Sequence, residues 1–91
     1  MKINVYSDPG HAWAKVKKSF LSQLGIADKI TTYSYMRDDY AYLEEDCDLS
    51  TLVSAMRSAG ITFEFREHVA RFKRSKIRNY DYYTNEGANN G

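Results

Sequence analysis

Short segments in which apolar and polar residues alternate recur along this chain, and they constrain its fold more than any other feature. Residues 2–6 place Ile3 and Val5 on one side, and residues 61–66 repeat the pattern with Ile, Phe and Phe. A period of two puts the apolar side chains on a single face of an extended strand. Both segments therefore predict strands that bury one face.

One segment between these strands has helical spacing instead. Apolar side chains in residues 49–56 recur at intervals of three and four, which aligns them along one face of a helix. Asp48 or Ser50 can cap the N-terminus, and Gly60 suits the residue after the C-terminus. We therefore expect an amphipathic helix with a buried stripe of Leu49, Leu52, Val53 and Met56.

Residues 11–24 fit two descriptions. A helix over the whole segment would align its large apolar side chains on one face. Residues 11–17 also alternate, so a short strand followed by a helix over residues 18–24 fits the pattern equally well. Gly25 can follow the helix in either case, because glycine accepts the left-handed conformation found there.

Two further strands form a predicted hairpin. Residues 30–36 are rich in Thr, Tyr and Ile, which favour strands, and residues 40–45 are a second strand candidate. The polar residues 37–39 between them are typical of a hairpin connection. The resulting order is β-α-β-β-α-β, with an optional extra strand at 11–17. It predicts a ferredoxin-like α+β two-layer sandwich, in which both helices cover one face of an antiparallel sheet and the other face is free.

A chain of 91 residues is expected to hold one domain with a modest core. We assign this α+β domain to residues 1–69. Residues 70–83 are basic and aromatic, and this C-terminal extension either packs Phe72 and Ile77 back on the domain or becomes ordered on a partner. Residues 84–91 have little to bury and are expected to form a disordered tail.

The composition indicates a soluble, cytoplasmic protein. No apolar run approaches the ~20 residues that a membrane span needs, and the first residues lack the apolar core of a secretory signal. Cys47 is the only cysteine, so the fold has no internal disulfide and suits a reducing compartment.

No set of residues predicts a catalytic or metal site. Asp8, His11 and His68 lack the spacing of metal ligands, and Asp8 suits the turn that follows it. The acidic neighbours of Cys47 would raise the pKa of its thiol and disfavour a nucleophilic thiolate, so we expect a buried structural cysteine. We therefore predict a protein that is not an enzyme and has no cofactor and no metal.

The net charge of +1 hides a strong segregation. Residues 38–48 carry six acidic side chains and no basic one, whereas residues 66–78 carry six basic side chains and one acidic one. Such asymmetry steers charged partners. The carboxylates of Glu44, Glu45, Asp46 and Asp48 could also bind a divalent cation, but their spacing differs from a calcium loop. A solvated strand end that favours the next helix N-terminus is the simpler interpretation.

Tyrosine is unusually frequent, with eight residues in the chain. If Ala41 and Leu43 face the helices, tyrosines of neighbouring strands gather on the free sheet face. Such a face can bind a protein, or it can stack the bases of a single-stranded nucleic acid whose phosphates meet the basic segment. We favour a protein, because the acidic segment would adjoin the tyrosines and the RNP signature is absent. The predicted partner-binding residues are Tyr6, Tyr33, Tyr35, Tyr40, Tyr42, Glu44, Glu45, Asp46, Arg66, Arg71, Lys73 and Arg74.

Four segments carry a resemblance to a known group of proteins: KINVYSDPGH at 2–11, LGIADKI at 24–30, YSY at 33–35 and YLEEDCD at 42–48. The chain resembles small accessory proteins encoded by tailed bacteriophages and prophages. The resemblance covers about residues 2–68, with Ala12 where the group has Gly. It brings no catalytic residues. It implies a protein that binds a host protein and blocks or redirects it.

Taken with the resemblance, the residues predict a non-enzymatic phage accessory protein in the host cytoplasm. We expect it to bind and inhibit a host or phage protein, such as a host defence or takeover target. The alternative is a module for single-stranded nucleic acid that uses the tyrosines and the basic C-terminal segment. A homodimer through a free sheet face or edge is compatible with a chain of this size.

Overall fold

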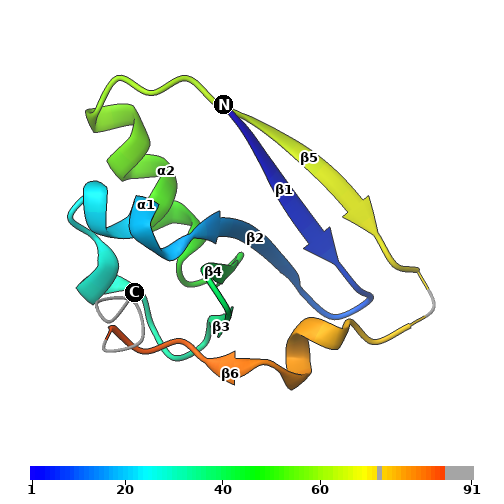
Figure 1. Ribbon diagram of the computed structural model, residues 1–91. Coiled ribbons are helices and arrows are strands. Elements are labelled where there is room, and N and C mark those ends of the chain that lie inside the picture. The colour runs from blue at the N-terminus through cyan, green and yellow to red at the C-terminus, as the bar shows by residue number, and fades with distance from the viewer. Residues whose placement is uncertain (72, 86–91) are drawn as a thin grey trace.

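The computed structural model describes residues 1–71 and 73–85, which form a six-stranded mixed sheet and two helices (Figure 1). The strands are β1 (Lys2–Ser7), β2 (Ala12–Lys17), β3 (Tyr35–Arg37), β4 (Tyr40–Glu44), β5 (Glu64–Val69) and β6 (Asp81–Tyr82). The helices are α1 (Lys18–Gln23) and α2 (Leu49–Ser58), and two 3-10 turns are η1 (Ala27–Lys29) and η2 (Lys76–Asn79). The predicted α+β class is confirmed.

The strand order is β5-β1-β2-β4-β3-β6, and this corrects the predicted ferredoxin-like arrangement. The optional strand exists as β2, and it lies between β1 and β4, which a ferredoxin-like sheet would place side by side. A tight turn explains the change, because Asp8 accepts hydrogen bonds from the backbone of Gly10 and His11 and returns the chain along β1. The sheet is also not purely antiparallel, since β1 and β5 run parallel.

The main core lies between one face of the sheet and the two helices. Leu21 of α1 and Leu52 and Met56 of α2 are fully buried there, against sheet residues that include Ile3 and Leu43. The helical stripe predicted for residues 49–56 is confirmed. Residues 11–24 follow the second description, with a strand and then a short helix.

The other face of the sheet is covered in part by the C-terminal segment, so the prediction of a free face is wrong. The segment with η2 and β6, orange in Figure 1, packs against this face. Ile77 is buried in a second apolar cluster with Trp13 and Tyr42, and β6 pairs with β3. Tyr83, from the same segment, is buried in the main core instead, and its hydroxyl donates a hydrogen bond to the carbonyl of Ala27. These side chains supply apolar contacts that no sequence periodicity signals.

Strand β3 begins at Tyr35, five residues later than predicted. The carboxylate of Asp48 is buried and accepts hydrogen bonds from the backbone and hydroxyl of Thr31 and from the hydroxyl of Ser34. These bonds hold residues 31–34 in a turn. They also occupy the Asp48 side chain, which therefore does not cap α2 as predicted.

Strand β5 begins at Glu64 and differs from the half-buried strand predicted at residues 61–66. All six of its side chains are exposed. The helices lie over the other end of the sheet in Figure 1, away from β5. Ile61 and Phe63 pack at the edge of the core before the strand begins. Phe72 and residues 86–91 of the predicted tail lie outside the described residues.

Candidate partner-binding surface

Four of the predicted tyrosines gather on the sheet face opposite the helices. Tyr6, Tyr35, Tyr40 and Tyr42 all pack in the cluster around Ile77, and we call this surface the tyrosine face. The alternation that turns Ala41 and Leu43 toward the helices explains it. Tyr33 does not join, because it lies in the turn before β3 with 69% of its surface exposed.

A groove of about 470 Å³ runs along the tyrosine face beside η2. Its aromatic walls are Tyr6, Tyr40, Tyr42 and Tyr80. Burial, with smaller contributions from Tyr80 and Tyr6, raises the pKa of Tyr42 to about 12. The Tyr42 hydroxyl therefore stays protonated at neutral pH. We call this hollow the tyrosine groove.

Cations lie directly over the rings of the tyrosine groove. The Lys15 ammonium nitrogen is 4.2 Å from the ring centre of Tyr40, and the Arg37 guanidinium carbon is 5.1 Å from that of Tyr80. Such contacts are cation–π interactions. The groove therefore combines aromatic surface with positive charge.

An ion pair fastens the C-terminal segment to the turn between β1 and β2. Asp8 accepts hydrogen bonds from Arg78 Nε at 2.7 Å and from Arg78 Nη2 at 2.9 Å. The backbone N–H groups of Gly10, His11 and Ser75 donate to the same carboxylate. Arg78 is the main cause, with these N–H groups, of a pKa of Asp8 far below its usual range. Asp8 is therefore a structural anchor.

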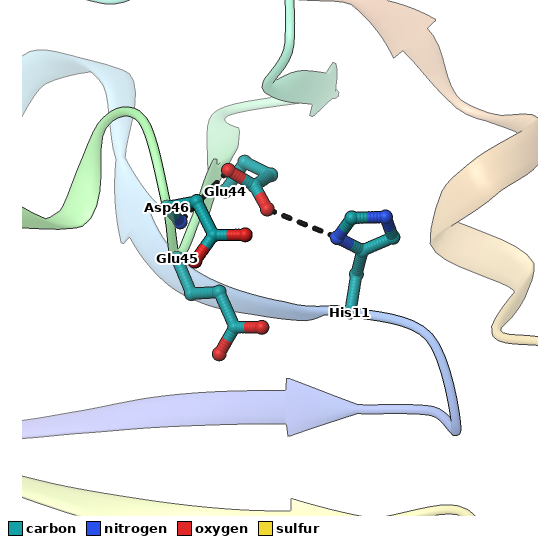
Figure 2. A group of neighbouring side chains, drawn as sticks. All are labelled: His11, Glu44, Glu45 and Asp46. Carbon is teal, nitrogen blue, oxygen red and sulfur yellow. Dashed lines mark hydrogen bonds and ion pairs between the residues drawn. The ribbon is translucent and has the colours of Figure 1, made fainter.

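His11 and three carboxylates meet where the turn after β1 approaches the end of β4 (Figure 2). His11 Nδ1 lies 3.1 Å from Glu44 Oε1, and Glu44 Oε2 accepts hydrogen bonds from the backbone of Asp46 and Cys47. One ligand atom from each of His11, Glu44, Glu45 and Asp46 fits within 4.8 Å of the others. Nitrogen and oxygen donors of this kind suit a divalent cation. Protein donors already occupy the buried Glu44 carboxylate, which gives it a structural role as well.

The structure does not assemble the trio of Asp8, His11 and His68. His68 lies on β5, where it stacks on Tyr6 with 4.8 Å between ring centres and meets the Asn4 side chain. Cys47 is exposed, which corrects the expectation of a buried cysteine. Desolvation and then the neighbouring Glu44 raise the pKa of its thiol, in the direction predicted.

Strand β5 has an open outer edge. The backbone N–H groups of Glu64 and Ala70 donate to β1. Because alternate residues of a strand direct their backbone groups to opposite sides, those of Phe65, Glu67 and Val69 point away from β1. No strand within residues 1–71 and 73–85 pairs with that side. Phe65 and Val69 are also 41% and 62% exposed.

The predicted basic residues lie along β5 and just after it. Arg66 is on the strand, and Arg71, Lys73 and Arg74 follow in the connection to η2, all exposed. None of the four takes part in an ion pair within the described part of the chain. They give the connection after β5 an excess of positive charge, whereas on β5 itself Arg66 is next to the exposed Glu67.

Two of the three cations of the tyrosine groove, Lys15 and Arg37, were missed from the sequence, whereas Lys76 belongs to the basic segment at 66–78 that was predicted to contact phosphates. A signal existed for Lys15, since a strand over residues 11–17 places it on the side opposite Ala14 and Val16. The helical alternative for that segment obscured it. The sequence also provided no reason to group His11 with the carboxylates of Glu44, Glu45 and Asp46, because His11 and Glu44 lie 33 residues apart.

Comparisons of the chain with family models, with curated proteins and with solved structures find no match. In the described residues, neither helix has the length and apolar character needed to cross a membrane.

Proposed function

We propose that this protein is a non-enzymatic accessory protein of a tailed bacteriophage or prophage, and that it binds and inhibits a host or phage protein through the outer edge of β5. The open edge is the observation that carries the proposal. An unpaired strand edge offers a row of backbone donors and acceptors, and an extended peptide can extend the sheet there.

Side chains beside the open edge supply specificity. Phe65 pairs in register with the buried Ile3 of β1, so Phe65 and Val69 extend the apolar face of the sheet beyond the helices. Glu67 lies between Phe65 and Val69 on the same face, so the two apolar side chains are separated by a carboxylate. The rings of Phe63 and Phe65 are in contact, with 5.5 Å between their centres. A partner strand with an apolar side chain on this face would bury them.

The charges favour an acidic partner segment. Arg66 and the three basic residues after β5 are exposed. Of the two acidic side chains of β5, Glu64 pairs with Lys2 at 3.7 Å and Glu67 is exposed, so basic residues are in excess. Opposite charge on a partner accelerates association and adds salt dependence. We therefore propose that the partner segment bound at the outer edge of β5 is extended and acidic. The resemblance to phage accessory proteins supports a host or phage protein as the partner.

The experiment is a capture from bacterial lysate that compares two variants at one position. Glu67→Pro removes a backbone N–H that points outward, so it blocks the edge while the bonds to β1 remain, and proline is tolerated on an edge strand. Glu67→Ala is the matched control, because it removes the same carboxylate and keeps the N–H. We expect wild type and Glu67→Ala to retain the same protein and Glu67→Pro to lose it.

Two results would contradict the proposal. One is a captured protein that Glu67→Pro retains as well as wild type does. The other is a wild-type chain that light scattering shows as a dimer and that Glu67→Pro converts to a monomer, since the occupant of the edge would then be a second copy. Circular dichroism of both variants checks that the fold is unchanged.

A further inference from the structure

The tyrosine groove has the size of a small-ligand site, and contacts within the protein hold its lining in place. Small-molecule pockets hold roughly 300–1,000 Å³, and this groove measures about 470 Å³. Its lining includes Tyr6 and Tyr42 of the sheet and Ile77 and Tyr80 of the C-terminal segment, and the rings of Tyr42 and Tyr80 are in contact, with 5.0 Å between their centres. The Asp8–Arg78 ion pair and the buried Ile77 hold the C-terminal segment in place.

Aromatic surface remains accessible in the groove. Tyr6, Tyr40 and Tyr80 are each partly exposed, whereas Tyr42 is buried. His68 stacks on one face of Tyr6, and Lys15 and Arg37 lie over one face of Tyr40 and of Tyr80, so a ligand meets the surface that these groups leave open. An aromatic base stacks on such rings whatever its identity, because every base has a π-face. The groove therefore suits a flat aromatic group.

Two lysines in the groove are available for an anion. Lys15 and Lys76 form no ion pair within the described residues, whereas Arg37 lies 3.9 Å from the Asp38 carboxylate. Lys15 lies directly over the Tyr40 ring. A ligand stacked in the groove would thus have a cation within reach of an attached anionic group.

We propose that the tyrosine groove binds an aromatic base joined to a phosphate. The base stacks on the exposed tyrosine rings, and the phosphate meets Lys15 and Lys76. This chemistry is shared by a free nucleotide and by a unit of single-stranded nucleic acid. The groove is separate from the β5 edge, so a negative result for the groove leaves the function proposed above unaffected.

Two carboxylates oppose this ligand and provide a sharp test. Asp38 and Asp39 line the same groove, and like charge there weakens binding of a phosphate. Asp38 has a φ of 54°, a left-handed conformation that Asn also accepts. Asp38→Asn should therefore preserve the hairpin and tighten binding.

The experiment is an NMR titration of the full chain at low salt with AMP, with adenosine, with inorganic phosphate and with a short oligo-dT. We expect backbone signals of Lys15, Tyr40 and Tyr80 to shift with AMP or oligo-dT, at lower concentrations than with adenosine or phosphate. Lys15→Gln and Lys76→Gln should each weaken binding about tenfold. Lys29→Gln, an exposed lysine outside the groove, is the matched control and should leave affinity unchanged.

The outcomes separate the sources of the ligand. Binding of oligo-dT without AMP identifies a strand, and binding of AMP without oligo-dT identifies a free nucleotide; both support the site. The proposal is overturned if neither shifts the groove signals. It is also overturned if Lys29→Gln weakens binding as much as Lys15→Gln, because nonspecific charge would then explain the binding. An affinity that Asp38→Asn leaves unchanged overturns it as well, because the phosphate would then lie away from the groove.

Discussion

Replacement of Asp8 by Asn tests whether one ion pair holds the C-terminal segment on the sheet. The Asp8 carboxylate is 1% exposed and the Arg78 side chain 21% exposed, so the pair is largely buried. Asn keeps the shape but loses the charge, and its amide donor would face the Arg78 donors. Removal of one partner of a buried pair costs roughly 3–5 kcal/mol. Because Arg78 retains some contact with solvent, we expect a loss of about 3 kcal/mol in the free energy of unfolding at neutral pH.

The same ion pair predicts how this loss depends on pH. The pKa of Asp8 is lower in the folded state than in the unfolded chain. Its contribution is therefore complete above the unfolded pKa of ~3.9 and is lost as pH falls toward the folded value. The difference in stability between wild type and Asp8→Asn should thus be largest at neutral pH and shrink below about pH 4.

The assay is urea unfolding followed by fluorescence of Trp13, the single tryptophan, which lies under the Arg78 guanidinium. Asp81→Asn, an exposed aspartate on β6, is the control for the loss of one charge. A difference below about 1 kcal/mol at neutral pH, the range of surface pairs, would refute the reasoning. So would a difference that stays constant down to about pH 3, since the charge of Asp8 would then be irrelevant.

Two further predictions concern groups with altered pKa values. Because burial raises the pKa of Tyr42 to about 12 and also raises the pKa of Tyr83, alkaline titration followed by ultraviolet absorbance should show two tyrosines that ionise late, and Tyr42→Phe should remove one of them; a full set of tyrosines that titrates near pH 10 would contradict this. Stability should fall from about pH 10 upward as the unfolded chain ionises first. The Cys47 thiol should react with a disulfide reagent more slowly than free cysteine at mildly alkaline pH, and Glu44→Gln should accelerate it, because the carboxylate that raises its pKa is gone.

Local sequence patterns predicted the elements whose conformation depends mainly on residues that are close in sequence. The stripe of residues 49–56 forms α2, and Gly25 and Gly60 follow the two helices with φ values of 73° and 72°. The hairpin between β3 and β4 was also predicted from its polar connection, which the structure shortens to Asp38 and Asp39 because Arg37 ends β3 and pairs with Tyr40. In each case, contacts within about ten residues specify the structure.

Contacts between distant residues could not be predicted in this way. The strand order depends on which edges meet, and alternation alone does not choose a partner. The cover over the tyrosine face depends on Arg78 meeting Asp8, and the shortened β3 depends on Asp48 binding Thr31 and Ser34. The candidate site was affected in the same way. The tyrosines were found by alternation, whereas their cover, groove and cations come from segments remote in sequence.

The Asp8–Arg78 ion pair has a consequence for the order of folding. It joins residues 70 positions apart and so closes nearly the whole chain into one loop. Closure of a long loop costs conformational entropy before its contacts repay it, and such contacts form late. During synthesis, the aromatic side of the sheet therefore stays uncovered until residues 76–80 have emerged. A chain that stops before Ile77 would leave this apolar surface exposed. Exposed apolar surface promotes aggregation of nascent proteins.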